Sequence, residues 1–378
     1  MTASLRVCSR CVMDTTASEI TFDDSGVCSF CQRFDKEIAP ALARVDTPEG
    51  ARRFREIIAS IQASGRGRKY DSLLGLSGGT DSSFLAHLAA RERLRPLVVH
   101  VDMGWNTPES EENVRLMTEK LRLDLKTVEV DFEVMRALQL SFYRAGVRNC
   151  EIPQDHAFLA VLYGVAAKHG IRTLLTGGNL ATESIMPRSW GYNAGDARHL
   201  RAIHRRFGSG SLRKYPTLGF LRRYVYYPFV RGIREVRLLN YILYNRAQAK
   251  ALLSSMYGWA DYGSKHFESA LTRFFQGYYL PTKFGVDKRK AHFSSLILSG
   301  QMTREQAVEK LAQPPYDPKQ LEVDMRAIAS ALKISLEEWR AILASPIRQH
   351  DDFPSQKWMF ALKDAVVTKL GLRERWWR

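Results

Sequence analysis

A stretch rich in glycine and hydroxyl side chains has the composition of a phosphate-binding loop. It comprises Ser77, Gly78, Gly79, Thr80, Asp81, Ser82 and Ser83, and lies between an apolar run at 72–76 and a helical pattern at 82–91. Glycine lets the backbone approach a phosphate closely, and a helix N-terminus offers unpaired N–H groups and a positive dipole end. The stretch is neither a GxxxxGKS/T loop nor a GxGxxG loop. The simpler interpretation is a well-capped helix.

In its full form, after an apolar run, the string SGGTDSS resembles the signature of the PP-loop ATP pyrophosphatases. That resemblance implies that residues 77–83 bind the pyrophosphate of ATP, with Mg²⁺ bridging its oxygens, and that AMP is released from an adenylated intermediate. Asp81 is our candidate for organising the metal or the loop.

Two further segments follow expected strands and extend this candidate nucleotide site. Asp102 ends the run at 97–101 and is expected to contact the nucleoside or a metal, unless it is only a solvated turn residue. Gly177, Gly178 and Asn179 follow the run at 172–176, where two glycines would let the backbone lie against adenine or ribose. Ligands of open α/β sheets bind at the carboxyl ends of strands, which is where both segments are expected to lie.

Four cysteines near the N-terminus have the spacing of a metal site. Cys8 and Cys11 form one CxxC pair, and Cys28 and Cys31 form a second. Four thiolates close a tetrahedral shell around Zn²⁺, so we expect a structural zinc ribbon. An iron–sulfur cluster is the alternative, because four thiolates also suit one. The fifth cysteine, Cys150, stands alone and could serve sulfur transfer or simply be a small buried hydrophobe.

Positive charge is concentrated in one segment. The chain has a formal net charge of +16, which suggests an anionic partner. Residues 198–237 contain eleven Lys or Arg and one acid, with aromatic residues between them. Such a pattern suits a groove for single-stranded nucleic acid, and equally a nucleotide-sugar site in which Arg binds phosphate or carboxylate. Lys288 and Arg289, further along the chain, are candidates for neutralising charge in the transition state.

Several long motifs together resemble a known enzyme family. They are the Cys8–Cys11 pair followed by VMDTT, SGGTDSS at 77–83, TGGNLATES at 176–184, WADYGSKHFES at 259–269 and KFGVDKRKAHFSSLI at 283–297. The chain resembles the N-acetyl sugar amidotransferases of bacterial surface-polysaccharide pathways, such as lipopolysaccharide O-antigen and flagellar-glycan synthesis. This resemblance implies an adenine-nucleotide α-hydrolase fold and conversion of a sugar acetamido group, on a nucleotide-sugar, to an acetamidino group.

The chemistry then needs ATP and a nitrogen donor. An amide oxygen can attack the α-phosphate of ATP to give an adenylated imidate, from which ammonia displaces AMP. No glutaminase triad is evident in the sequence. The resemblance therefore implies a separate glutaminase and a cyclase-like partner that channels ammonia. The alternative is a tRNA-modifying PP-loop enzyme, either a sulfur transferase or a lysidine-type ligase. A non-catalytic nucleic-acid-binding module is a third interpretation, which the intact phosphate loop disfavours.

The elements that must position these residues alternate along the chain. Apolar runs at 72–76, 97–101, 125–130 and 172–176, with a fifth expected at 224–230, are separated by helical patterns at 82–91, 108–121 and 155–169. Alternating strands and helices predict a parallel α/β sheet. We expect three regions: a zinc-ribbon module at 1–45, a PP-loop ATP pyrophosphatase domain at 46–240, and a mainly helical substrate or partner domain at 241–378.

Length and composition agree with this outline. A chain of 378 residues with 45% apolar and 25% charged residues is globular rather than disordered. Its first ten residues have no apolar core of signal-peptide length, and its longest apolar run, at 157–167, is too short to cross a bilayer. We therefore expect a cytoplasmic protein with no membrane partner.

Overall fold

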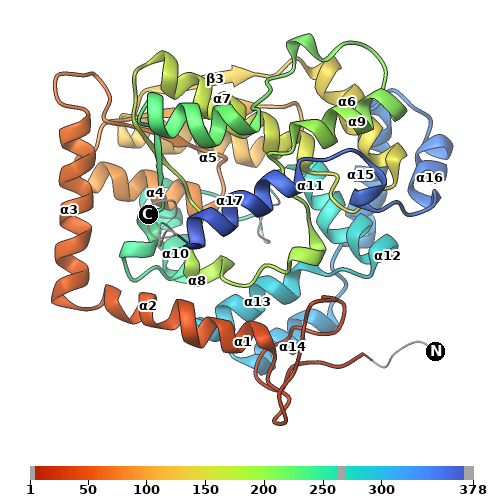
Figure 1. Cartoon of the computed structure of the whole chain (residues 1–378), viewed down its shortest axis with the longest axis horizontal. Coiled ribbons are helices and arrows are strands. Elements are labelled where there is room, and N and C mark those ends of the chain that lie inside the picture. The colour runs from red at the N-terminus through yellow and green to blue at the C-terminus, as the bar shows by residue number, and fades with distance from the viewer. Residues whose placement is uncertain (1–4, 263–266, 268, 370–378) are drawn as a thin grey trace.

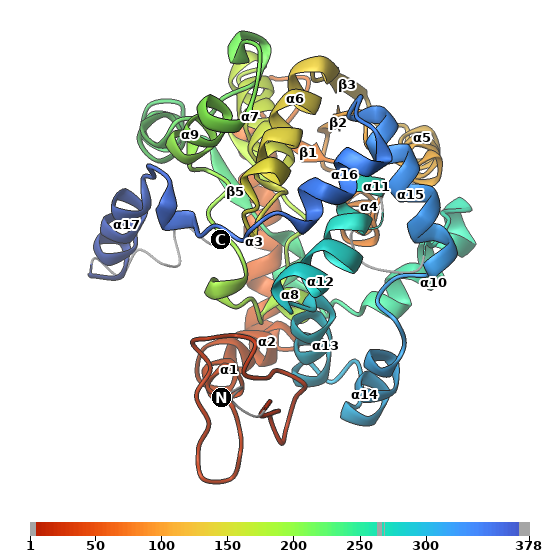
Figure 2. The same cartoon turned by 90° about the vertical axis from the view of Figure 1, so that its right-hand side faces the viewer.

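The computed structural model describes residues 5–262, 267 and 269–369. Its centre is a sheet of five parallel strands in the order β3-β2-β1-β4-β5. Figure 2 labels β1, β2 and β3 near one another, with helices around them. The strands are β1 (Ser72–Gly75), β2 (Pro96–Asp102), β3 (Leu125–Glu129), β4 (Thr173–Leu175) and β5 (Arg234–Val236). β1 and most of β2 are buried apolar runs, as central parallel strands require, whereas β3 alternates as an edge strand does.

Helices cover both faces of the sheet. Those before and within the sheet region are α1 (Ser29–Arg33), α2 (Ala39–Val45), α3 (Pro48–Ser64), α4 (Thr80–Arg91), α5 (Pro108–Leu121), α6 (Phe132–Ala145), α7 (Ile152–Lys168), α8 (Leu180–Glu183) and α9 (Ala197–Phe207). Neighbouring residues of a strand face opposite cores: Leu74 packs with α3, α4 and α5, whereas Leu73 packs with α6 and α7.

The described part of the C-terminal region is mainly helical, with loops between the helices. It comprises α10 (Arg246–Tyr257), α11 (Ala270–Phe274), α12 (Leu280–Phe284), α13 (Lys288–Leu298), α14 (Arg304–Ala312), α15 (Pro318–Ala331), α16 (Leu336–Ala344) and α17 (Lys357–Lys369). α13 and α14 lie beside α1 and the N-terminal loops, as both views show (Figure 1 and Figure 2). The predicted fold class is thus confirmed: a parallel sheet, an N-terminal four-cysteine region and a helical C-terminal region.

The expected strand at 224–230 is wrong. Residues Arg222–Val230 form a π-helical segment that contains Pro228. Tyr227 is buried and stacks on Tyr163 of α7 at 5.0 Å, whereas Phe229 is 71% exposed. Phe220 and Tyr224 instead pack on Phe360 of α17, far away in the sequence. The fifth strand is the short polar segment Arg234–Val236, which pairs with β4.

No helix within the described residues is long and apolar enough to span a membrane. The nearly uninterrupted apolar run of α7 instead covers the sheet, where Leu162 and Val161 belong to the same core as β1 and β2.

Candidate functional site

The strand order creates a crevice beside β1. From β1 the chain proceeds to β2 and β3 on one side of the sheet, and β4 and β5 lie on the other. The carboxyl ends of β1 and β4 are neighbours, so the loops that follow them face each other. A change of direction in strand order is the usual binding site of open α/β sheets. Both glycine-rich segments of the sequence lie at this point.

The loop after β1 passes directly into helix α4, whose N-cap is Gly79. Gly78 has φ +82°, and a Cβ there would lie 2.3 Å from the carbonyl oxygen of Ser110. The carbonyl oxygen of Gly78 accepts hydrogen bonds from the Trp259 indole at 2.9 Å and from the Asn113 amide at 3.3 Å. The loop is therefore held from α5 and from the C-terminal region, and it requires glycine.

The hydroxyls of the loop gather at one end of α4. The Oγ atoms of Ser77 and Ser82 lie 3.2 Å apart, and the N–H of Gly79 donates to Ser77 Oγ at 3.3 Å. Gly177, from the loop after β4, packs so closely that a Cβ would be 3.2 Å from the backbone of Asp81 and Ser82. The two glycine-rich loops thus form one surface of backbone and hydroxyl groups.

Asp81 is anchored by a tyrosine from outside the sheet. The Tyr244 hydroxyl donates a hydrogen bond to Asp81 Oδ1. Burial, and then the nearby Asp81 carboxylate, raises the pKa of Tyr244 well above its usual range. The phenol therefore stays protonated and available as a donor, and it fixes the orientation of the carboxylate on the first turn of α4.

A cavity of about 330 Å³ opens above these loops. Most of the predicted nucleotide-binding residues line it: Ser77, Gly79, Thr80, Asp81, Ser82, Gly177 and Gly178. Four predicted residues do not, namely Gly78, Ser83, Asp102 and Asn179. Asp102 accepts from the backbone N–H of Gly104 at 2.8 Å, and Asn179 caps α8 by accepting from Thr182 at 2.9 Å. Both side chains hold turns that shape the cavity.

The sequence analysis missed a polar stripe at the start of α7. Glu151, Gln154 and Asp155 line the cavity, followed on the same helix by Phe158 and Leu162. The spacing of three and four residues places all of them on one helix face. This signal was readable, because polar residues interrupt only the first turn of an otherwise apolar helix. Other missed residues on the wall come from scattered elements: His100, Glu183, Arg246, Ser269 and Thr272.

Lys288 and Arg289 line a second cavity of about 430 Å³ and not the first. The Arg289 guanidinium bonds to Asp287 at 2.7 Å and to the carbonyl oxygens of Lys310 and Gln313. These bonds hold the side chain in place, and its predicted role in neutralising charge stays a prediction. Lys288 lies closer to the first cavity, because its ammonium group pairs at 3.2 Å with Glu151 on that wall.

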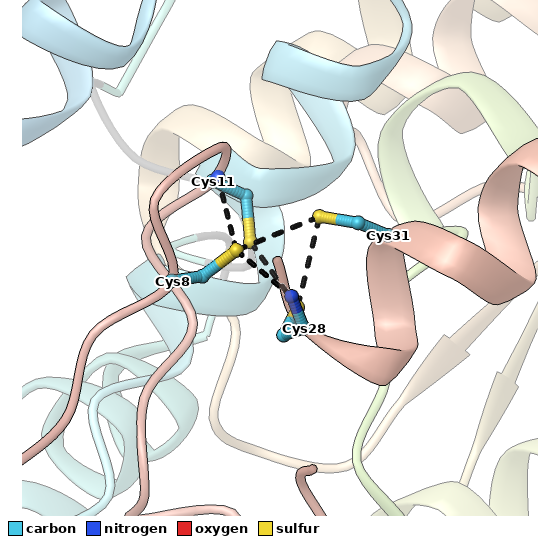
Figure 3. Close-up of side chains that lie close together, drawn as sticks. All are labelled: Cys8, Cys11, Cys28 and Cys31. Atoms are coloured by element: carbon cyan, nitrogen blue, oxygen red, sulfur yellow. Dashed lines mark hydrogen bonds between the residues drawn. The ribbon is translucent and has the colours of Figure 1, made fainter. Parts of the chain in front are cut away.

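The four N-terminal cysteines converge on one point (Figure 3). All four are buried, and their Sγ atoms lie within 4.8 Å of one another. The Sγ–Sγ separations are 3.8 Å for Cys8–Cys31, 3.7 Å for Cys11–Cys28 and 3.6 Å for Cys28–Cys31. Four thiolates this close together repel one another, and a bound cation would offset that repulsion. The predicted set therefore suits a metal ion.

The cysteine region is fastened to the C-terminal helices. Arg304 on α14 donates to the carbonyl oxygens of Cys8 and Cys11, both at 3.2 Å. Lys290 on α13 pairs with Asp14, which is almost fully buried. The helix that begins at Lys288 is consequently positioned in part by the cysteine loops.

Neither Cys150 nor the basic segment contributes to the two cavities. Cys150 is buried, which raises its thiol pKa well above the usual value, and its S–H contacts the carbonyl oxygen of Val147. The residues of 198–237 are absent from both lining sets. Some of them are paired, as in Arg223 with Glu235 and Lys214 with Asp131. Arg237, the last cation of the segment, nevertheless lies beside the loop after β4, because its guanidinium would be 3.7 Å from a Cβ at Gly178.

Two family models match the chain. Residues 268–365 match the LPS biosynthesis protein WbpG-like, C-terminal domain. Residues 268–365 are called the WbpG-like domain below, after this similarity. Residues 72–156, which include the phosphate loop, match the phosphoadenosine phosphosulfate reductase domain. The WbpG-like domain contributes Ser269 and Thr272 to the loop cavity, and Lys288 and Arg289 to the second cavity.

The solved structures that match the chain are distant in sequence, and their TM-scores are low. The NH3-dependent NAD synthetase of Campylobacter jejuni is 16% identical, with 42% of this chain and 72% of that chain covered, at a TM-score of 0.30. The U34-tRNA thiolase NcsA of Methanococcus maripaludis, solved with its [4Fe-4S] cluster, is 15% identical. The match covers 88% of this chain and 90% of that chain, at a TM-score of 0.34. Among curated proteins no match was found.

Proposed function

We propose that this protein is an ATP-dependent, AMP-forming amidotransferase that converts a sugar acetamido group to an acetamidino group in bacterial surface-glycan synthesis. The observation that carries the proposal is the wall of the loop cavity. It joins the phosphate loop after β1 to Ser269 and Thr272 of the WbpG-like domain. A nucleotide bound at the loop would therefore face residues of a domain named for LPS biosynthesis.

The loop has the donors that pyrophosphate needs. The backbone N–H groups at the start of α4 point toward the cavity end of the helix, and Ser77, Thr80 and Ser82 add hydroxyls. Mg²⁺, when bound, neutralises phosphate charge. Protein sites for it use one or two carboxylates plus substrate phosphates, and Asp81, Asp155 and Glu183 on the wall fit that donor set.

The reaction needs two displacements. The acetamido oxygen attacks the α-phosphorus of ATP, and pyrophosphate leaves as its bond to that phosphorus breaks. Ammonia then attacks the carbon of the adenylated imidate, and the C–O bond breaks to release AMP. Of the four N–H hydrogens of amide and ammonia, three remain on the protonated amidine and one leaves as a proton. Glu151 and Asp155 are the carboxylates on the cavity wall that can accept it.

The ammonia comes from separate proteins in this proposal. A glutaminase releases it and a cyclase-like partner channels it to the loop cavity. Cys150, the cysteine outside the four-cysteine set, is buried away from both cavities, and its raised thiol pKa makes it unsuited to glutaminase chemistry in this chain.

Zinc is the metal we propose for the four cysteines. A tetrahedral ion with Zn–S bonds of ~2.3 Å holds its sulfurs roughly 3.8 Å apart. The separations of 3.6 to 3.8 Å support that geometry. An iron–sulfur cluster places several iron and sulfide atoms between the thiolates, so its ligands stand farther apart than around a single ion.

A tRNA-modifying reaction is the second candidate. The observation in its favour is the exposed basic row on α9, which includes Arg198, Arg201 and Arg205. The buried position of Cys150 disfavours the thiolation version, because a sulfur carrier needs an accessible thiolate.

The test is an assay for AMP. The protein is incubated with MgATP, ¹⁵N-ammonium and a nucleotide-linked diacetamido sugar acid, or with tRNA in place of the sugar. We expect sugar-dependent AMP and a product containing ¹⁵N. AMP formation that depends on tRNA and not on sugar would refute the proposal.

Variants of Asp81 test the assignment within the loop. We expect Asp81→Ala and Asp81→Asn to lower AMP formation by roughly a hundred-fold or more, since each removes a negatively charged donor for the Mg²⁺ that neutralises the phosphates. Both Asp81 variants should keep the wild-type content of the metal proposed for the four cysteines. Asp46→Ala, at an exposed aspartate outside both cavities, is the matched control. Wild-type activity in Asp81→Asn would show that the negative charge is not needed.

A further inference from the structure

The second cavity lies between α10, α13 and α14 and has no role in the reaction described above. It measures about 430 Å³, within the usual size of small-molecule sites. One part of its wall is apolar, with Phe293 and Leu296 from α13 and the pair Pro314 and Pro315. Such a wall suits the face of a sugar ring or a base.

The charged residues on the wall are all basic. They are Arg246, Lys250, Lys288, Arg289 and Lys310, and no Asp or Glu is among the described lining residues. Three of the five are balanced by carboxylates outside the lining set: Lys250 by Asp261, Lys288 by Glu151 and Arg289 by Asp287. Arg246 and Lys310 have no carboxylate within ion-pair distance in the described part of the chain. Counting only the residues that the structure describes, the cavity therefore carries an uncompensated positive charge.

Arg246 lies where the two cavities meet, because it lines both of them. It is the first residue of α10, and its Nε atom is buried without a hydrogen-bond partner among the described residues. A buried guanidinium donor without a partner costs free energy, which an oxyanion in hydrogen-bond contact would offset. The pair of Lys288 and Glu151 also spans the boundary, with one member on each wall.

We propose that the second cavity binds the anionic group of the acceptor sugar, with Arg246 as its principal contact and Lys310 at its edge. This inference rests on the proposed function, since it orients the acetamido group toward the phosphate loop. The anion is a carboxylate on the sugar or the diphosphate of its nucleotide carrier. A separate site for the acceptor leaves the loop cavity to ATP, so both substrates bind together.

Binding can be measured without catalysis. Calorimetry is carried out on the full-length protein saturated with a non-hydrolysable ATP analogue and Mg²⁺. One arm uses UDP-N-acetylglucosamine, which has a diphosphate and no carboxylate. The other uses a free N-acetylhexosaminuronic acid, which has a carboxylate and no phosphate. The arm that binds identifies the anion.

The variants are Arg246→Gln and Lys310→Glu. A charged hydrogen bond lost from a half-buried site should weaken binding by roughly ten-fold to a hundred-fold for Arg246→Gln. The exposed Lys310→Glu should weaken it about three-fold to ten-fold, and less at high salt. Arg198→Gln and Lys319→Glu make the same charge changes at exposed positions outside both cavities and should bind as wild type does. Arg246→Lys, which keeps the charge, should recover part of the loss.

Two results would overturn the inference: no binding in either arm, or equal binding by wild type and both cavity variants. Failure of the proposed function looks different. It appears in the AMP assay as tRNA-dependent activity, whereas failure of this inference leaves sugar-dependent AMP formation intact in Arg246→Gln and Lys310→Glu.

Discussion

At the scale of single residues, the candidate site depends on backbone conformation as much as on side-chain chemistry. Gly78 has a positive φ and lies against the backbone of α5, so it decides how closely a phosphate can approach the loop. The Asp81 carboxylate gains its orientation from Tyr244, a residue more than 160 positions away. The loop is therefore a local motif whose working geometry is imposed from outside.

The cost of a side chain at Gly78 can be separated from the cost of its φ. Gly78→Ala should lose AMP formation and unfold at lower temperature, since the new Cβ meets the Ser110 carbonyl oxygen at 2.3 Å. Gly210→Ala is the matched control, with φ +77° but nothing within 4 Å, and should lose only about 1 kcal/mol of stability. Equal melting temperatures and activities in the two variants would contradict the close approach.

At the scale of elements, α13 links the cysteine region to the second cavity. Its first residue, Lys288, lines that cavity, and its third, Lys290, pairs with the buried Asp14 beside the cysteine loops. The cysteine region holds the same end of α13 that presents cations to the second cavity. The geometry of the second cavity therefore depends on the cysteine region. We therefore expect the metal to matter for the geometry of the acceptor site.

Lys290→Met tests this dependence. It leaves Asp14 buried without its cationic partner, which should cost about 3 kcal/mol of unfolding free energy. We expect faster release of the bound metal to a chelator, together with a higher KM for the sugar and a smaller change in that for ATP. Lys319→Met, an exposed lysine on α15, is the control. Metal release at the wild-type rate would contradict the proposed link.

At the scale of the whole molecule, buried histidines make folding sensitive to acid. His199 of α9 lies within an aromatic cluster, 4.0 Å from the ring of His350 and 5.7 Å from that of Phe353. Burial, and then the charge of His350, lowers the pKa of His199 to about 3. The folded protein therefore keeps this ring neutral while the unfolded chain takes up a proton, so stability falls as the pH drops from about 6.5 toward 3.

His199→Phe should remove part of this pH dependence. Between pH 7 and 5.5 the wild-type free energy of unfolding should fall by about 1 kcal/mol more than that of the variant. Urea unfolding at a series of pH values measures the difference. His169→Gln, at an exposed histidine, should keep the wild-type slope. Parallel curves for wild type and His199→Phe would show that the buried ring does not contribute.

Much of the fold was predictable, because its signals are local. The apolar runs of the strands and the residues at the starts of α4 and α5 are patterns of neighbouring residues. Four of the five strands were predicted from such apolar runs. β5 did not, since a three-residue polar strand has no pattern and exists through its pairing with β4. The aromatic segment before it has the sequence pattern of a strand. It is not a strand in the structure, where its aromatic side chains pack on Phe360 of α17.

The sequence by itself determined the phosphate loop and the four-cysteine set, because the chemistry of each is carried by residues close together in the chain. Tertiary structure alone decided what surrounds them. Helix α7 brings Glu151 and Asp155 over the loop, and α10 places Arg246 between two cavities. The cations of 198–237 line neither cavity, although Arg237 lies beside Gly178 at the edge of the first. Fewer cations, from α10, α13 and α14, converge on the second. The physical reason is that the charge density at a site depends on the distances between side chains in space. Those distances cannot be inferred from how far apart the residues are in the sequence.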